Sequence, residues 1–465
     1  MRLVSLIVVT LSMAGVPTIK VMAQARTQYT SAQLPTPGSN ASVMPITQWS
    51  QAKLYTRLTN QTPTSAGPVL LSAHRGLWKY YPENVESSMR EAVERGYEIL
   101  EVDVRPTSDH GCVLSHDDNL AKLTNYSGNM TDRTESDLRN LSVRHHQGVY
   151  IPQRTGNTSP NNSGQSYDHM LSLYDALAIM DSYVKPGPGT PVFYSFSGQA
   201  TGPLLMIDVK THAGKTPGGG AAVVVAPADI QADTALLADC TQEVQNYIYD
   251  QSHSGNNNYG TAIANAIVFK IIPQSFDYNP AVLCQPYSTS QTYFQVERRI
   301  IPVYAPDTAT DDPSTDSRFL EFNKRFLSGD GSSGCVVAFE FFQHHSSDRT
   351  DAYMSYLDSA SQAGHGYAHW VMPSFLPEGV GYANCCFQTF FGSADSAVFA
   401  KLGGPDFPAY WANTGFGLRR NFTMETSDQV GSMCSLLKAQ GLRMASDMTA
   451  LDATGRSRPS CPASE

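Results

Sequence analysis

The sequence has little charge, and the balance of that charge is acidic. Charged residues make up 16% of the 465 positions, and the formal net charge is -10 at pH 7. This balance argues against a nucleic-acid partner, which would select a basic face. It does not argue against small phosphates, because a bound metal ion can reverse the local field. Hydrophobic residues make up 41% of the chain, which is enough for a sizeable core and excludes disorder throughout.

Long hydrophobic runs are missing beyond the N-terminus, where no stretch approaches the ~18 apolar residues of a membrane helix. At the N-terminus, Arg2 precedes an apolar run over residues 3–16, and Ala23-Gln24-Ala25 has the small-x-small form of a cleavage site. The pattern predicts a signal peptide over residues 1–25 and a secreted, extracellular protein. The alternative is an uncut membrane anchor, for which Lys20 makes the run short.

Zinc-type cysteine spacing is also missing, since no CxxC pair with matching histidines occurs. The eight cysteines are an even number in an exported chain, so they predict disulfides, with the pairing left open. Asn-x-Ser/Thr triplets predict a glycoprotein. These triplets begin at Asn40, Asn60, Asn125, Asn129, Asn140, Asn157, Asn161 and Asn421.

Strand and helix patterns alternate along most of the chain. This predicts an α/β fold, specifically a (β/α)8 TIM barrel with insertions and a disulfide-rich C-terminal excursion. The predicted organisation is a leader over 26–66, a barrel over 67–450 with insertions at about 119–200 and 379–412, and a tail over 451–465. Nine strand candidates compete for eight places: 68–74, 99–104, 204–210, 266–271, 300–304, 335–342, 367–372, 417–423 and 442–446. One of 367–372 and 417–423 is therefore expected to lie outside the barrel, and the pattern does not say which.

Ionisable residues gather at the ends of the first two apolar strands. His74 closes the run that begins at Val69, and Glu101 and Asp103 lie two apart in the next run. Residues i and i+2 of a strand face the same side, so the two carboxylates point together. Buried unpaired charge is costly, so a cation is expected beside them. His116 follows a short hairpin after the second strand.

The third strand candidate repeats this pattern with Asp208 and Lys210. The carboxyl ends of barrel strands line one site, so Asp208 is expected to join Glu101 and Asp103 as an all-oxygen set for Mg2+ or Ca2+. Lys210 and Arg75 add the positive charge that a phosphate needs. Two histidines can act as acid and base, which together describes cleavage of a phosphodiester. Each residue alone has an ordinary structural reading as a core histidine or a salt bridge, and the set is what favours a site.

These residues also form ordered motifs, and the stretch from about 69 to 152 resembles the glycerophosphodiester phosphodiesterase family. The motifs are His74-Arg75-Gly76, Pro82-Glu83-Asn84, Glu101-Val102-Asp103-Val104, Thr107-Ser108-Asp109 and His116-Asp117. The resemblance implies a TIM barrel and metal-dependent hydrolysis of a small glycerophosphodiester to glycerol 3-phosphate and an alcohol. It implies that His74 and His116 are the acid-base pair and that Arg75 and Lys210 contact the phosphate. It further implies that Glu83 supports the site and that Glu101, Asp103 and Asp208 bind the metal.

The third ligand position departs from the family pattern. Members usually carry Glu in Ile-Glu-Ile-Lys, where this chain has Ile207-Asp208-Val209-Lys210. The shorter side chain leaves Mg2+ or Ca2+ open and resembles the sphingomyelinase D branch, which acts on intact lipids. Peripheral lipid contact through the aromatic residues of 379–412 is therefore one alternative, against a plain core role for them. A barrel that binds without cleaving is another, although no key residue is lost. The leaving alcohol, the oligomeric state, and hydrolysis by water or through a cyclic phosphate remain open.

Overall fold

The structure is a computed structural model, and it describes sixteen stretches and single residues of the chain. They are residues 51–59, 69–78, 81–145, 150–154, 166–181, 183, 203–210, 227–253, 266–271, 299–304, 320, 335–343, 366–371, 423–427 and 430–431 with 434. The predicted signal peptide, the C-terminal tail and the excursion at 379–412 lie outside these residues. No helix in the described part combines the length and the apolar character needed to span a bilayer.

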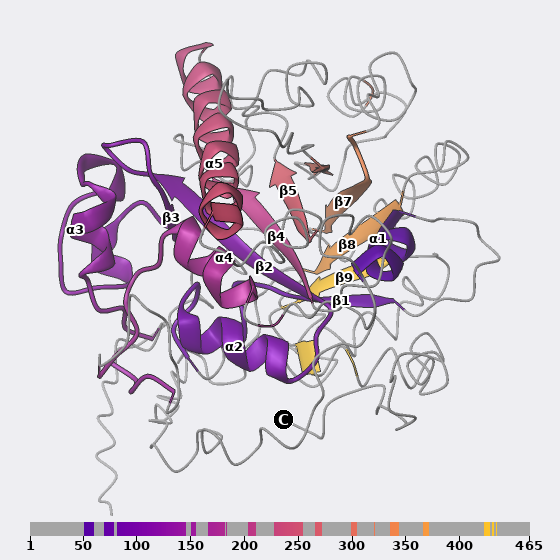
Figure 1. Cartoon of the computed structure of the whole chain (residues 1–465), viewed down its shortest axis with the longest axis horizontal. Helices are drawn as coiled ribbons and strands as arrows, with labels where there is room; N and C mark the ends of the chain where they lie inside the picture. Colours follow the sequence, from indigo (N-terminus) through magenta and orange to yellow (C-terminus); the bar gives the residue numbers. More distant parts are fainter. Residues whose placement is uncertain are drawn as a thin grey trace, which may run out of the picture.

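Eight parallel strands form a ring that the pairing of its first two strands closes. They are β1 (Leu70–Ala73), β2 (Ile99–Pro106), β4 (Leu204–Val209), β5 (Ile267–Ile271), β6 (Ile300–Tyr304), β7 (Ala338–Gln343), β8 (Gly366–Val371) and β9 (Met424–Ser427). Figure 1 shows most of these strands with their labels. Each pairs with the next along the chain, and β9 returns to pair with β1, which also pairs with β2. The short β3 (Cys112–Leu114) lies antiparallel on β2, outside the ring. A closed ring of eight parallel strands is the TIM-barrel arrangement, so the predicted fold class is confirmed.

The last strand lies where the sequence did not predict it. The candidate at 367–372 is in the ring as β8. The last strand of the ring, β9, begins at Met424, directly after the candidate at 417–423, of which only Thr423 is among the described residues. Its sequence, Met-Glu-Thr-Ser, is short and half polar, so it lacks the apolar run that marks the other strands. The ring is complete without the candidate at 442–446, which lies outside the described residues.

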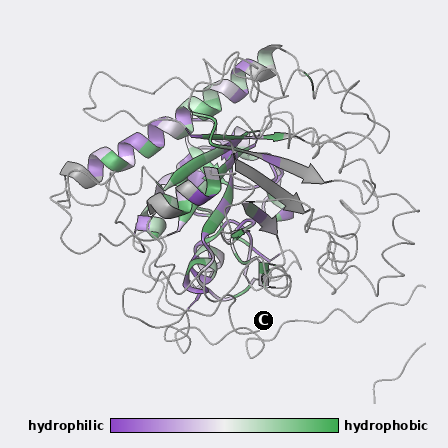
Figure 2. Ribbon diagram, turned by 90° about the vertical axis from the view of Figure 1, so that its right-hand side faces the viewer, coloured by the Kyte–Doolittle hydropathy of each residue, from purple (hydrophilic) through white to green (hydrophobic). Residues whose placement is uncertain are grey.

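Helices lie outside the ring between its early strands. They are α2 (Glu86–Glu94), α4 (Leu173–Asp181) and α5 (Pro227–His253), with the short α3 (Glu135–Arg139) and the 3-10 turns η1 (Leu120–Lys122) and η2 (Met130–Asp132) after β3. In α5 the buried residues recur three or four positions apart, as a helix with one packed face requires. They include Leu236, Leu237, Cys240, Val244, Tyr247 and Ile248. Figure 2 shows apolar and polar residues alternating along this helix.

The interior of the barrel near the start of the strands is apolar, and we call this the lower layer. It contains Leu70, Ile99, Leu204, Met206, Val268, Ile301, Ala338 and Met424, all of them buried. The helix α1 (Gln51–Thr59) packs Leu54 and Leu58 into the same cluster. Its carbonyl at Leu58 accepts a hydrogen bond from Oγ1 of Thr423, at the start of β9. The predicted leader therefore contains a helix that closes the lower end of the barrel.

The interior near the end of the strands is charged, and we call this the upper layer. It contains His74, Glu101, Asp103, Asp208, Lys270, Glu340 and Thr426, which are all fully buried. Lys270 of β5 pairs with Glu101 of β2 and Glu340 of β7, strands that are not its neighbours, so these side chains meet across the inside of the ring. The upper layer is at the carboxyl ends of the strands, where TIM barrels place their active sites.

Candidate active site

The turn after β1 folds over the end of β2. Arg75 has a φ of +56° and Gly76 a φ of +75°. A Cβ at Gly76 would lie 2.8 Å from the backbone carbon of Ser88, so glycine is required by both the conformation and the close approach. The backbone N–H of Arg75 donates to Oε2 of Glu101 at 2.9 Å. The His-Arg-Gly motif therefore fixes one oxygen of a site carboxylate through the main chain.

The side chain of Arg75 is held between two carboxylates. Its Nη1 lies 3.0 Å from Oε2 of Glu83, and its Nε lies 3.1 Å from Oδ2 of Asp103. Both carboxylates are buried. Glu83 therefore orients the guanidinium of Arg75 beside Asp103, and its supporting role in catalysis stays a prediction.

Asn84 binds Asp103 twice. Its Nδ2 donates to Oδ2 of Asp103 at 2.9 Å, and the backbone N–H of Asp103 donates to its Oδ1 at 3.0 Å. Asn84 has a φ of +57°, a conformation that asparagine tolerates better than most residues. The Pro-Glu-Asn motif thus serves the site with two consecutive residues, whereas the sequence assigned a role only to Glu83.

Lys210 bridges the carboxylates of β2 and β4. Asp103 and Asp208 are register partners on these adjacent strands. The Nζ of Lys210 lies 2.8 Å from Oδ1 of Asp103 and 2.6 Å from Oδ2 of Asp208. Asp208 is therefore next to the other predicted ligands, with one oxygen bound by lysine.

Lys270 and Glu340 belong to the site and were missed in the sequence. The Nζ of Lys270 lies 2.9 Å from Oε2 of Glu340, 3.5 Å from Oδ2 of Asp208 and 3.7 Å from Oε1 of Glu101. Oε1 of Glu340 accepts a hydrogen bond from Oγ1 of Thr426 at 2.9 Å. A lone charge in an otherwise apolar strand was the available signal, whereas Asp208 was identified together with Lys210 two positions on.

Three of the buried residues are arranged to hold a metal ion. One ligand atom from each of His74, Glu101 and Asp103 lies within 4.8 Å of the others. Among the described residues, Oε1 of Glu101 and Oδ1 of Asp208 accept no hydrogen bond. Carboxylate oxygens suit a hard divalent cation, and buried ones without donors favour its binding. The residues present therefore fit a divalent cation, for which Glu101 and Asp103 are the central ligands of the site.

His116 lies at the rim of the site, on the segment that leaves β3. Its side chain is 26% exposed, in contrast with the fully buried His74. Its Nδ1 lies 3.6 Å from Oδ1 of Asp117, which in turn pairs with Lys122 at 2.8 Å. The Nε of Arg105 donates to the backbone carbonyl of His116 at 2.7 Å. These contacts hold the ring while leaving part of it open to a ligand.

The charges of the site separate the pKa values of its acids. Burial, and then the charge of Asp103, raise the pKa of Glu101 to about 8. Burial also works to raise the pKa of Asp103, but the opposing charges of Lys210 and Arg75 hold it well below its usual range. Burial, followed by the positive charges of Arg75 and Lys210, lowers the pKa of His116 to about 4. At neutral pH His116 is therefore neutral and able to accept a proton.

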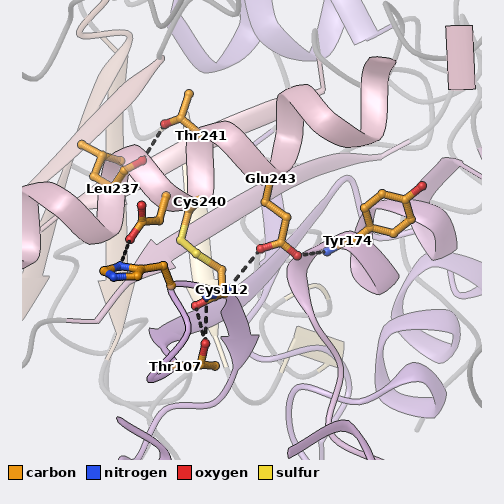
Figure 3. The surroundings of a disulfide bond; sticks show 10 residues. Thr107, Cys112, Tyr174, Leu237, Cys240, Thr241 and Glu243 are labelled. Atoms are coloured by element: carbon orange, nitrogen blue, oxygen red, sulfur yellow. Dashed lines mark hydrogen bonds and ion pairs between the residues drawn. A yellow bond between two sulfur atoms is a disulfide. The ribbon is translucent and has the colours of Figure 1, made fainter. Parts of the chain in front are cut away.

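The hairpin that carries His116 is fastened to α5. A disulfide joins Cys112 of β3 to Cys240 of α5, which confirms the expectation of disulfides and supplies a pairing that the sequence left open (Figure 3). Glu243, one turn further along α5, accepts hydrogen bonds from the backbone N–H groups of Cys112 at 3.1 Å and Tyr174 at 2.7 Å. Cys335 and Cys434 are disulfide-bonded as well. The described sequon residues, Asn125, Asn129 and Asn140, are exposed, and their glycosylation stays a prediction.

Comparison with known proteins identifies the segment that holds most of this site. Residues 74–185 match the glycerophosphoryl diester phosphodiesterase family, whose members are phosphoric diester hydrolases. The match confirms the resemblance and the enzyme class for this part of the chain, and it continues through most of the stretch predicted as the first insertion.

Individual relatives resemble the chain over different lengths. An uncharacterized protein of Sinorhizobium fredii is 25% identical over 328 residues, which are 69% of this chain and 71% of that protein. A glycerophosphodiester phosphodiesterase of Caldanaerobacter subterraneus is 36% identical over 74 residues, which are 16% of this chain and 30% of that protein. Among solved structures, a phosphodiesterase of Oleispira antarctica in complex with sn-glycerol-3-phosphate is 12% identical. That comparison covers 80% of this chain and 97% of the other, with a TM-score of 0.41.

Proposed function

We propose that this chain is a secreted, divalent-cation-dependent phosphodiesterase that hydrolyses small glycerophosphodiesters to glycerol 3-phosphate and an alcohol. The observation that carries the proposal is the upper layer together with Arg75, Lys210 and His116, which adjoin it. Two histidines, several buried carboxylates and two cationic side chains suited to binding phosphate lie together at the carboxyl ends of the barrel strands. Most of these residues belong to the stretch 74–185 that matches the family. The N-terminal signal-peptide pattern and the Cys112–Cys240 disulfide support secretion.

His116 is the proposed base. Its neutral ring takes the proton of the attacking hydroxyl, which is that of water or of the substrate's own glycerol. Nδ1 faces Asp117, which leaves Nε2 for this proton. His74 is then the proposed acid that returns a proton to the leaving alcohol. Arg75 and Lys210, which lie against Asp103, are the groups that bind the phosphate oxygens.

The proposed cation binds to Glu101 and Asp103, with Asp208 as the third carboxylate. When bound, Mg2+ or Ca2+ would stabilise negative charge on the phosphate. The protein holds these ligands from several sides: Asn84 and Lys210 orient Asp103, and the N–H of Arg75 orients Glu101. The cluster of possible ligand atoms in the structure consists of His74, Glu101 and Asp103. Glu101 and Asp103 therefore belong both to this cluster and to the proposed set with Asp208.

Product analysis tests this function. Purified mature protein is incubated with glycerophosphocholine, lysophosphatidylcholine or sphingomyelin, with EDTA or with added Mg2+ or Ca2+, and the phosphate products are followed by 31P NMR. We expect glycerol 3-phosphate from glycerophosphocholine, a transient cyclic phosphate only if the glycerol hydroxyl attacks, and no turnover in EDTA. Cleavage of the intact lipids alone would replace the proposal with the sphingomyelinase D alternative, and turnover in EDTA would remove the cation.

A further inference from the structure

Lys270 lies among three carboxylates that come from three different strands. Glu101, Asp208 and Glu340 each place an oxygen between 2.9 and 3.7 Å from its Nζ. Such a set of carboxylate oxygens is the typical coordination environment of a hard metal cation. In this chain an ammonium group is in that position, and it is covalently part of the barrel.

The ammonium group of Lys270 is surrounded by carboxylates and closed to solvent. Lys270 is fully buried, and so are its three carboxylate partners. Arg75 and Lys210, by contrast, retain 5% and 7% exposure and lie nearer the open end of the site. A buried charge of this kind is costly unless its environment uses it, because an apolar residue fills a barrel interior at lower cost.

Glu340 and Thr426 hold Lys270 in place. Glu340 makes the shortest of its three ion pairs and is itself fixed by the Thr426 hydroxyl. Lys270 is also the register partner of Asp208 on the adjacent strand. The short third carboxylate and the lysine beside it thus form one unit, in which Asp208 is shared between two ammonium groups.

We propose that Lys270 is a fixed internal cation that shares Glu101 and Asp208 with the divalent ion and limits how tightly that ion is held. Glu340 is the counter-charge that draws Lys270 away from these two carboxylates. The inference rests on the cation of the proposed function, and it makes Lys270 a positioning residue. Removing the charge of Lys270 strengthens cation binding, and removing the charge of Glu340 weakens it.

Mn2+ binding measured by EPR titration tests this pair of opposite signs. Lys270→Met is expected to bind Mn2+ at least tenfold more tightly than the wild type, and Glu340→Gln at least threefold more weakly. The double variant, Lys270→Met with Glu340→Gln, restores the charge balance and is expected to return to within about threefold of the wild type. Circular dichroism and thermal unfolding show that each variant is folded.

Shifts in the same direction for both single variants, or no shift in either, overturn the inference, because a merely structural role has no reason to reverse sign. If Lys270→Met does not fold, Glu340→Gln decides alone: weaker binding supports the inference, and unchanged or tighter binding overturns it. A wild type that binds Mn2+ but does not cleave glycerophosphodiesters contradicts the proposed function and leaves this test intact. A wild type without Mn2+ binding contradicts the proposed cation, and a gain of binding in Lys270→Met then still supports the inference, whereas no gain overturns it.

Discussion

The lower and upper layers of the barrel come from the same strands, a few residues apart. In β4 the inward positions change from Leu204 and Met206 to Asp208, and in β5 from Val268 to Lys270. The lower layer is apolar and closed by α1, so its residues have only packing to contribute. The upper layer combines at least five buried acids and bases in one network of ion pairs. The contrast teaches that stability and chemistry can be separated along a single strand.

The sharpest separation is expected at His116. Replacing it with alanine should lower turnover by about 10²–10⁴-fold, the usual contribution of a general acid or base. The free energy of unfolding should change little, because the ring is partly exposed. Turnover of glycerophosphocholine and urea unfolding measure the two effects. His110→Ala, a histidine of the same hairpin with an 83% exposed side chain, is the control and should keep full activity.

A change in the lower layer should do the reverse. Leu204→Ala removes a buried side chain and should lower the free energy of unfolding by about 2–5 kcal/mol. Turnover per folded molecule should stay within about twofold of the wild type. Asp208→Asn, four residues along β4, should instead lower turnover more than tenfold. If Leu204→Ala reduces turnover as strongly as Asp208→Asn in folded protein, the two layers are not separable.

The disulfide allows a test of a third location, outside the ring. Replacing both Cys112 and Cys240 with serine should lower the free energy of unfolding by about 2–5 kcal/mol. Turnover should fall only severalfold, because Glu243 still binds the hairpin through the backbone of Cys112. Adding Glu243→Gln to the double variant should lower turnover further. A double variant with unchanged thermal stability would show that the hairpin is held without the disulfide.

The smallest effect is a pH dependence, in which an acid of the upper layer and an acid on α5, outside the ring, should respond differently to metal. The pKa of Glu101 is raised to about 8, so the folded state binds its proton more tightly than the unfolded state. In metal-free protein this contributes stability that increases as pH falls from about 8 toward the usual glutamate range. Burial likewise raises the pKa of Glu243 to about 8, and this residue lies on α5 against the backbone of Cys112 and Tyr174.

Thermal unfolding at pH 8.5 and 6.5 measures both contributions, each up to about 2 kcal/mol. Glu101→Gln and Glu243→Gln should each remove part of the gain at pH 6.5. Saturating Mn2+ should cancel only the part due to Glu101, because the cation takes the place of the proton. If Mn2+ leaves the stability gained between pH 8.5 and pH 6.5 unchanged in both variants, Glu101 does not bind the cation.

The sequence predicted the parts of the site that depend on local patterns. Glu101 and Asp103 lie two apart on one strand, so the common direction of their side chains is a property of the strand itself. His74 and Arg75 were identified because they directly follow an apolar run. Lys270 and Glu340 were missed because their partners are 62 or more positions away along the chain. A single charge in an apolar strand has meaning only when the opposite side of the ring is known.

The same limit applies to the fold. The alternation of strands and helices predicted the barrel, and the short, polar β9 was misplaced because only its neighbours β8 and β1 make it a strand. The helix α1 was predicted as part of a loose leader. Leu54 and Leu58, four apart, were the available signal for it, although the surface that they cover consists of strands from both ends of the chain.

The contact of α1 with β9 has a consequence for the order of events during synthesis. Leu58 and Thr423 are hydrogen-bonded although 365 positions separate them in the sequence, and a similar separation lies between the paired strands β1 and β9. At about 5–20 residues per second, the ribosome needs roughly 20–70 s to supply the final strand. During that interval one edge of β1 has no strand to pair with and is open to other chains. The interval before the ring closes is therefore the one in which a newly made molecule is most exposed to aggregation, and in which a chaperone would have most effect.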